Sequence, residues 1–309
     1  MLCKRYEGNP ILTPTDNWWE TKAVFNCAAV RHENQIHMLY RAVGDDNTSR
    51  FGYAVSEDGF RFKRFPLPVF EGEQGNEFER LGVEDPRITK INETFYITYV
   101  AASTYPAAEG RPPTFGVGPP WRCRVSLAST TDFKTFRRHG VILPEFDDKD
   151  AVLFPEKVKG RWVMYHRILP DIWISYSDDL IHWTDHAAFL TPRPGCWDDN
   201  RVGAGAPPIK TRSGWLNFYH AADHNRVYRL GVFISDLDDP SIVIARPEEP
   251  ILTPQDVFEC EGCVNNVVFT CGVIERERDF LIYYGGGDSS IGAATLDKSQ
   301  LSDFIGMPI

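Results

Sequence analysis

The segment Gln35-Ile36-His37-Met38-Leu39-Tyr40-Arg41 is followed, after a short polar stretch, by Gly52-Tyr53-Ala54-Val55-Ser56-Glu57-Asp58-Gly59-Phe60-Arg61-Phe62. Both segments are rich in aromatic and β-branched residues, which favour strands. The Asp58-Gly59 pair is typical of a tight turn between antiparallel strands. This cassette of an aromatic strand, a loop, a strand ending in serine and an aspartate turn therefore predicts one small antiparallel sheet.

The same cassette recurs along the chain, and its four further copies begin near Thr94, Arg161, Trp215 and Asp279. A spacing of roughly 55 to 65 residues fits a four-stranded blade with one extended loop better than a helical repeat. Five copies predict an all-β protein, a five-bladed β-propeller spanning residues 1–309 as one domain. The segment Pro10–Pro14 (PILTP) returns at Pro250–Pro254, and we expect the N-terminal segment to complete the last blade.

Composition narrows the classes of function. The chain has 309 residues and a net charge of −10, which argues against a nucleic-acid partner. No apolar run approaches the roughly 18 residues of a membrane span, and the start lacks an apolar signal core, so we expect no membrane association and a cytoplasmic location. Seven scattered cysteines indicate reduced thiols. Cys260 and Cys263 lack the further ligands of a zinc site, so we expect no metal.

Propeller geometry places polar residues at one mouth of the central channel, because the loop after the innermost strand of each blade opens on that face. Polar groups of this kind occur in all five copies: Arg41 with Asp45, Asp46 and Asn47; Glu84, Asp85 and Arg87; His166 and Arg167; Tyr219 and His220; and Gly285-Gly286-Gly287-Asp288. Carboxylates and guanidinium groups arranged around aromatic walls are suited to binding a sugar. The sequence therefore indicates a polyol site.

The most informative stretch within this set is Gly82-Val83-Glu84-Asp85-Pro86-Arg87. It lies between two expected strands, which predicts a loop at the rim of a sheet. Pro86 is expected to hold Asp85 in extended geometry, and neighbouring residues on an extended chain point to opposite sides. Asp85 is then a candidate acid, with Glu84 directed elsewhere. A strand-capping turn with a surface ion pair is the alternative.

At these residues the chain resembles glycoside hydrolase family 130, the inverting β-mannoside phosphorylases, which are five-bladed propellers. The likeness covers nearly the whole chain and rests on the order and spacing of several segments: Phe25–Val30, Tyr40–Ala42, Gly82–Arg87, Arg124–Ala128, Phe154–Lys157, Tyr165–Arg167, Gly203–Thr211 and Asn265–Phe269. The resemblance implies cleavage of a short β-mannooligosaccharide with inorganic phosphate as co-substrate and no cofactor. The products would be α-mannose 1-phosphate and a shortened acceptor.

The resemblance also implies roles for individual residues. Asp85 matches the family's catalytic aspartate, whose proton is thought to pass through the 3-hydroxyl group of the sugar. Phosphate is already an anion, so a cationic cradle replaces the base of an inverting hydrolase. The candidates for phosphate binding are Arg124, Lys157, His166, Arg167, Lys210, Tyr219 and His220. Those for the sugar are Asn26, Arg41, Asp46, Glu84, Arg87 and Asp288.

Several alternatives stay open at this stage. Without the resemblance, Lys157 and Lys210 are better interpreted as solvated loop lysines, and a rim ion pair is the alternative for Asp46. A β-mannosidase on the same scaffold and a glycan-binding propeller without catalysis are the competing functions. The linkage, β-1,2 or β-1,4, and a homo-oligomeric state are undecided. The Pro- and Gly-rich stretch from Tyr105 to Trp121 is expected to be a loop over the face that shapes the acceptor site.

Overall fold

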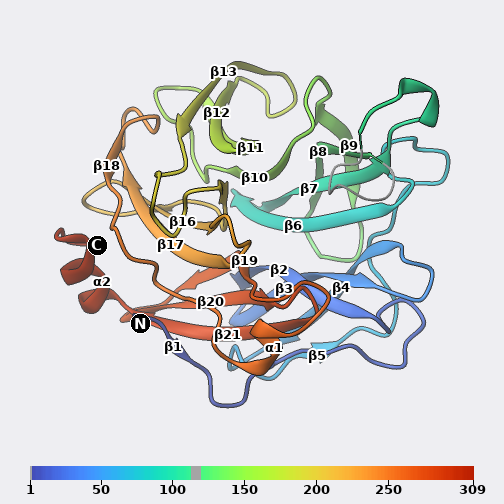
Figure 1. The fold of residues 1–309 in the computed structure, drawn as a ribbon, viewed down its shortest axis with the longest axis horizontal. Helices are drawn as coiled ribbons and strands as arrows, with labels where there is room; N and C mark the ends of the chain where they lie inside the picture. The colour runs from blue at the N-terminus through green and yellow to red at the C-terminus, as the bar shows by residue number, and fades with distance from the viewer. Residues whose placement is uncertain (1, 113–119) are drawn as a thin grey trace.

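The computed structural model describes residues 2–112 and 120–309, and it is a five-bladed β-propeller, as the repeat predicts (Figure 1). Blades 1 and 2 share one hydrogen-bonded sheet, and blades 3, 4 and 5 are separate sheets. Blade 1 contains β2 (Ala23–His32), β3 (Gln35–Val43), β4 (Ser49–Ser56) and β5 (Lys63–Arg64). Blade 2 contains β6 (Gly82–Ile91), β7 (Thr94–Thr104), β8 (Trp121–Thr130) and β9 (Arg137–Leu143).

The other blades follow the same antiparallel order. Blade 3 contains β10 (Lys149–Leu153), β11 (Trp162–Ile168), β12 (Asp171–Ser177) and β13 (Trp183–Leu190). Blade 4 contains β14 (Arg201–Ala204), β15 (Ile209–Lys210), β16 (Trp215–Ala222), β17 (Tyr228–Ser235) and β18 (Val243–Ala245). Blade 5 contains β19 (Val268–Glu275), β20 (Asp279–Gly286), β21 (Ser290–Asp297) and β1 (Lys4–Arg5). The helical segments are short: η1 (Ala107–Glu109), α1 (Val257–Cys260) and α2 (Lys298–Ile305).

The repeated serine and aspartate of the cassette build the same turn in successive blades. In blade 1 the Ser56 hydroxyl accepts a hydrogen bond from the amide of Gly59, and the Asp58 carboxylate accepts from the next two amides. Thr130 with Asp132, and Ser177 with Asp179, form the equivalent bonds in blades 2 and 3. Short polar side chains favour such turns because they replace backbone partners. The recurring motif therefore stabilises the turns of hairpins and is not a catalytic motif.

Aromatic side chains fill the spaces between neighbouring blades. Phe51 of blade 1 contacts Tyr99 of blade 2 edge to face, with ring centroids 6.0 Å apart. Tyr40 and Tyr283 belong to one buried cluster between blades 1 and 5. Each side chain of this size contributes on the order of 3 kcal/mol when buried. The core is therefore distributed around the ring, and it fixes the innermost strands that carry the polar residues.

The start of the chain completes blade 5, and a separate pairing joins blades 1 and 2. In blade 5, Lys4 and Arg5 of β1 pair with Thr295 and Ala294 of β21, so a segment from the start of the chain is the outer strand of the last sheet. The Arg5 guanidinium donates to both carboxylate oxygens of the buried Glu259, at 2.8 and 2.7 Å. Blades 1 and 2 are joined by a single parallel pairing of Ser49 with Gly82.

Candidate active site

Three innermost strands carry the same local distortion. Asn26 in β2, Asp85 in β6 and Asp150 in β10 have φ values of 44°, 50° and 56°, and each strand shows a shift of register at that residue. Asparagine and aspartate tolerate this left-handed region better than other residues with a side chain. A bulge bends the strand and redirects a side chain. The three polar groups are buried, and they approach the central axis from three blades.

The geometry expected around Pro86 was wrong. Gly82 to Arg87 lies inside β6 and not on a loop, and Asp85 has a left-handed backbone although it precedes a proline. Hydrogen bonds to its carboxylate from two other blades accompany this conformation. Because of the bulge, Glu84 and Asp85 do not point to opposite sides: both carboxylates accept hydrogen bonds from Arg41, at 2.5 and 3.2 Å.

Asp85 lies at the centre of the cluster. One carboxylate oxygen accepts from the amide of Asn26 at 2.9 Å and from Arg41, and the other accepts from the ammonium group of Lys149 at 3.0 Å. Asp85 is fully buried. Burial opposes its charge, but Lys149, Arg41 and Arg87 outweigh burial and lower the pKa of the carboxyl group well below its usual range. Asp85 is therefore ionised while the site is empty of substrate.

Two other carboxyl groups near Arg41 behave differently. Burial raises the pKa of Glu84, although the charge of Arg41 opposes the shift. Burial also raises the pKa of Asp288 to about 6, again against Arg41. Asp288 follows β20 and has a left-handed φ of 49°. The site thus holds neighbouring carboxyl groups of very different acidity, an arrangement that is common where protons are transferred.

A second cluster surrounds Asp150. Its carboxylate receives Arg87 at 3.0 Å, Arg167 at 2.9 Å and the Nε2 atom of His220 at 3.0 Å. Burial lowers the pKa of His220 to about 4 against the charge of Asp150, so the ring is neutral at pH 7. With Nε2 directed at Asp150, the neutral tautomer keeps its proton there. Asp150 therefore holds two guanidinium groups and an imidazole in fixed positions.

Three buried polar atoms in and near this cluster have no hydrogen-bond partner among the described residues. Among the described residues, Nε of Arg167, Nδ1 of His220 and Oδ1 of Asn26 are buried and make no hydrogen bond. Lys149 is directly opposite Arg167 in the β10 and β11 register, so two cations lie side by side. Of these atoms only Nε of Arg167 is a donor, whereas Nδ1 of His220 and Oδ1 of Asn26 are acceptors. A buried unpaired donor beside a second cation is costly unless a ligand compensates it. This arrangement favours an anionic ligand.

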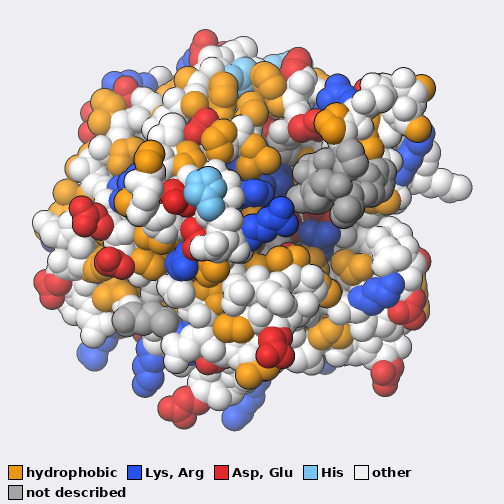
Figure 2. Space-filling model, viewed as in Figure 1, with side chains coloured by type: hydrophobic (Ala, Val, Ile, Leu, Met, Phe, Trp, Pro, Cys, Tyr) orange, Lys and Arg blue, Asp and Glu red, His pale blue; other side chains and the backbone are white. Residues whose placement is uncertain are grey.

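One face of the molecule is hollowed near its centre, and side chains of lysine and arginine gather in the hollow (Figure 2). The side chains of Arg41 and Lys149 are partly exposed, at 15% and 25%, whereas Asp85 lies beneath them. A ligand that enters the channel therefore meets cationic groups before it reaches the Asp85 carboxylate.

Four of the residues predicted for phosphate binding lie outside these two clusters or use their polar atoms elsewhere. Lys157 follows β10 and Lys210 ends β15, so both lie at the opposite end of their blades, 3 and 4. There Lys157 donates to a carbonyl of blade 3, and Lys210 pairs with Glu156. Tyr219 points away from its neighbour His220 and donates to Asp198 at 3.0 Å. Arg124 bonds to Pro144, Cys123, Asp147 and Tyr105.

Two further predicted residues occupy supporting positions. His166 is fully buried between the Asp148 carboxylate, at 2.5 Å, and the Ser175 hydroxyl, at 2.6 Å. Asp148 also accepts from the backbone amide of Arg167, so this group fixes the strand beside Lys149. Asp46 forms a rim ion pair with Arg50 at 2.6 Å, and the bonds from Arg50 lower the pKa of Asp46 to about 2.

The remaining predicted residues do converge. The structure brings Asn26, Arg41, Glu84, Asp85 and Arg87 together, with Arg167 and His220 in the adjoining cluster and Asp288 within electrostatic reach. Sequence reasoning missed Lys149 and Asp150. The signal was a charged pair immediately before the apolar residues Ala151–Leu153, in the same relation to an inner strand as Glu84 and Asp85.

Other kinds of site find little support in the described part of the chain. Within residues 2–112 and 120–309, no group of three or more His, Cys, Asp or Glu side chains is arranged to hold a metal ion. In the same ranges no helix is both long and apolar enough to cross a membrane. The predicted loop over the face includes residues 113–119, which lie outside the described residues. Its first residue, Tyr105, is buried and donates to Asp147 at 2.8 Å.

Comparison with known proteins identifies the family of the chain. Residues 4–306 match the model of glycoside hydrolase family 130, described as β-1,4-mannooligosaccharide phosphorylase. The chain is 45% identical over 306 residues to a 1,2-β-oligomannan phosphorylase of Thermoanaerobacter sp., covering 96% of this chain and 98% of that protein. It is 42% identical over 312 residues to a β-1,2-mannobiose phosphorylase of the same organism, with the same coverage.

A solved structure gives the same result. The β-1,2-mannobiose phosphorylase of Listeria innocua, in complex with β-1,2-mannobiose, superposes with a TM-score of 0.86 at 29% identity and covers 99% of both chains. Similarity therefore extends over the whole propeller and includes the strands that carry Asn26, Asp85 and Asp150. The chain belongs to glycoside hydrolase family 130, the family of mannoside phosphorylases.

Proposed function

We propose that the protein is an inverting phosphorylase of short β-1,2-mannooligosaccharides. The observation that carries this proposal is the adjacent pair Lys149 and Arg167, in which the Nε–H group of Arg167 has no hydrogen-bond partner. Two adjacent cations are suited to a doubly charged anion such as phosphate. The choice of the β-1,2 linkage follows the two Thermoanaerobacter relatives and the Listeria structure.

In the proposed reaction, an oxygen of inorganic phosphate attacks the anomeric carbon of the terminal mannose from the side opposite the glycosidic bond. The bond from phosphate oxygen to carbon forms while the glycosidic bond breaks, so the β configuration is inverted to α. Asp85 supplies the proton that the leaving oxygen receives, passed through the 3-hydroxyl group of the mannose. The products are α-mannose 1-phosphate and an oligosaccharide shortened by one unit.

Asp85 must be protonated to serve as the acid, and its surroundings in the free protein hold it ionised. Phosphate bound beside Lys149 partly neutralises that cation and adds negative charge near Asp85. Both effects raise the pKa of the carboxyl group. We therefore expect phosphate binding to be accompanied by proton uptake, which calorimetric titrations in buffers of different ionisation enthalpy measure.

The direct test is an assay of purified protein with β-1,2-mannobiose and β-1,2-mannotriose, with and without phosphate. We expect mannose 1-phosphate only when phosphate is present. Free mannose formed at the same rate without phosphate would indicate a hydrolase, and binding of the sugar without any turnover would indicate a binding protein.

Asp85→Asn tests the assigned acid. General acid catalysis contributes about 10² to 10⁴ in rate, so we expect kcat to fall by about that factor while the substrate still binds. Asp178→Asn is the matched control, because this carboxylate is exposed on blade 3 and the variant should keep the native rate. Native kcat in Asp85→Asn would place the acid on another residue.

A further inference from the structure

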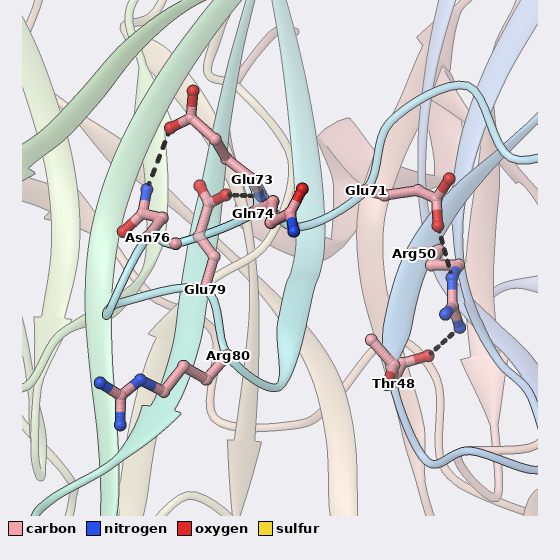
Figure 3. Close-up of a pocket in the computed structure, with 10 residues that line it drawn as sticks. Thr48, Arg50, Glu71, Glu73, Gln74, Asn76, Glu79 and Arg80 are labelled. Atoms are coloured by element: carbon pink, nitrogen blue, oxygen red, sulfur yellow. Dashed lines mark hydrogen bonds and ion pairs between the residues drawn. The ribbon is translucent and has the colours of Figure 1, made fainter.

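A separate pocket of about 390 Å³ lies beside the candidate active site, at the border of blades 1 and 2 (Figure 3). Its lining comes from the start of β4 and from the segment that leads into β6, including Thr48, Arg50, Gln74, Asn76 and Arg80. The residues are mainly polar, and none belongs to the two clusters around Asp85 and Asp150. The pocket has no role in the reaction described above.

Two chain segments carry residues of both the pocket and the active site. Thr48 and Arg50 flank Ser49, whose hydroxyl donates to Glu84 at 3.2 Å and accepts from Arg41 at 3.1 Å. Arg80 lies two residues before Gly82, which pairs with Ser49 and begins the strand that carries Asp85. The same two chain segments therefore contribute to the inner site and line the pocket, so the two adjoin at the border of blades 1 and 2.

The outer wall of the pocket is firmly held. Buried Glu79 accepts a hydrogen bond from the backbone amide of Glu73 at 2.8 Å (Figure 3). It also accepts from the Tyr99 hydroxyl at 2.8 Å and from Arg138 at 2.9 Å. Side chains held in this way need little ordering when a ligand binds. The wall is thus preorganised, although it belongs to a long irregular segment.

An exposed tryptophan contacts Arg50, one of the residues that line the pocket. Trp18 is 54% exposed, and the Arg50 guanidinium lies 4.7 Å from the centre of its ring. Its neighbour Trp19 is fully buried and donates to the carbonyl of Pro66. The backbone of Trp18 is therefore anchored while its ring faces solvent, and exposed aromatic rings next to a polar pocket are typical of binding surfaces.

We infer that this pocket, together with Trp18, is a subsite for mannosyl units on the acceptor side of the cleaved bond. The inference rests on the proposed function, in which the terminal mannose lies at the buried end of the channel by Asp85. The following sugar units must then extend toward the rim. The occupant is a neutral polyol, because Arg50 is already paired with Glu71 at 2.7 Å and with Asp46, whereas the exposed amide group of Gln74 suits sugar hydroxyls.

The test compares phosphorolysis of β-1,2-linked mannobiose, mannotriose and mannotetraose by Trp18→Ala and Arg80→Ala. Both side chains are exposed, so the variants should fold. We expect kcat/KM on the tetraose to fall about tenfold, equivalent to ~1.4 kcal/mol, while kcat/KM on the biose stays within about twofold. Ile242→Ala and Arg61→Ala are the matched controls, with similarly exposed side chains at the opposite ends of their blades.

Equal losses on biose and tetraose, or no loss on the tetraose in either variant, would overturn the subsite. Calorimetric binding of mannotetraose without phosphate keeps this result separate from the proposed function. If the native protein makes no mannose 1-phosphate, the proposed function fails, and the subsite is then judged by binding alone. Weaker tetraose binding in Trp18→Ala and Arg80→Ala supports it, and unchanged binding rejects it.

Discussion

At the scale of single residues, Lys149 is the cation that links the two parts of the site. It donates to Asp85 and is opposite Arg167, whereas Lys157 and Lys210 lie at the other end of their blades. Removing one charge-assisted hydrogen bond costs about 1.5 to 3 kcal/mol. We expect Lys149→Met to raise the KM for phosphate about ten- to a hundredfold.

The matched controls for Lys149→Met are Lys157→Met and Lys210→Met. Both remove a lysine that the sequence had placed in the phosphate cradle, and initial rates over a range of phosphate concentrations measure the effect. We expect the KM for phosphate to stay within about twofold of native in both. A large increase in either control, with none in Lys149→Met, would return the cradle to the other end of the blades.

His220 gives the protein a dependence on pH. Its folded pKa of about 4 lies below the unfolded value of about 6.5, so protons bind to the unfolded chain first as the pH falls. Stability is therefore fully present above about pH 7, and it is lost progressively between about pH 6.5 and 4. From pH 7 to pH 5 this single group accounts for about 2 kcal/mol of the free energy of unfolding.

Urea unfolding of His220→Gln at pH 7 and pH 5 measures that contribution. We expect the variant to lose less stability than the native protein over this interval. His224→Gln, which changes an exposed histidine of the same blade, should keep the native dependence on pH. The same loss in His220→Gln as in the native protein would show that other groups carry the effect.

At the scale of elements, the bulge of β2 depends on an opposing glycine in β20. A Cβ atom at Gly285 would lie 2.6 Å from the Asn26 side chain and 3.0 Å from its backbone nitrogen. Gly285→Ala should therefore destabilise the protein by about 1 to 3 kcal/mol, the usual cost of overpacking. It should also displace the amide that donates to Asp85 and lower kcat.

A double-mutant cycle isolates the contact between the two elements. If the Asn26 side chain is the main obstacle, Gly285→Ala should cost less stability in the Asn26→Ala background than in the native one. Chemical unfolding of the four proteins gives the coupling energy. Strictly additive losses would assign the clash to the backbone of β2 instead.

The sequence was sufficient to predict the strands and their turns, but not the bulges. Aromatic strands and the serine and aspartate turns repeat with a fixed spacing, so their positions follow from local pattern. A bulge changes the direction of one side chain without changing composition. Glu84 and Asp85 were therefore assigned to opposite sides by strict alternation, and Lys149 with Asp150 went unnoticed because no pattern distinguishes a bulged pair from a surface pair.

At the scale of the whole molecule, blade 5 depends on the short strand β1. Arg5 pairs with Glu259, which has no exposed surface and a lowered pKa because burial is outweighed by the hydrogen bond from Arg5. Removing one partner of a buried pair leaves an uncompensated charge. We expect Arg5→Ala to lower the free energy of unfolding by about 3 kcal/mol.

Thermal unfolding of Arg5→Ala measures this loss, and Lys4→Ala is the control. Lys4 is the preceding, exposed residue of the same strand, so its replacement should leave Tm close to the native value. Folded Arg5→Ala should keep the native kcat, because the pair lies on blade 5 away from Asp85. A stability equal to that of Lys4→Ala would show that the pair contributes no net free energy.

The number of blades was also predictable, because each copy of the repeated cassette corresponds to one blade. The residues that meet at the axis of the propeller were harder to predict. Lys157 and Lys210 lie within segments that resemble the family, yet a four-stranded blade is long enough to separate its two ends by several residues of strand, at about 3.3 Å each. A place in such a segment does not reveal which end of the blade a residue occupies.

The left-handed bulges of β2, β6 and β10 have one more consequence. Three blades present one polar side chain each from an equivalent backbone position, as Asn26, Asp85 and Asp150. The backbone conformation is the same at the three positions, and the short polar residue at each position determines its chemistry. Replacing asparagine with aspartate, or the reverse, at one of these positions would change the charge around the axis without rebuilding a loop, so the charge of the site can be altered by a single substitution.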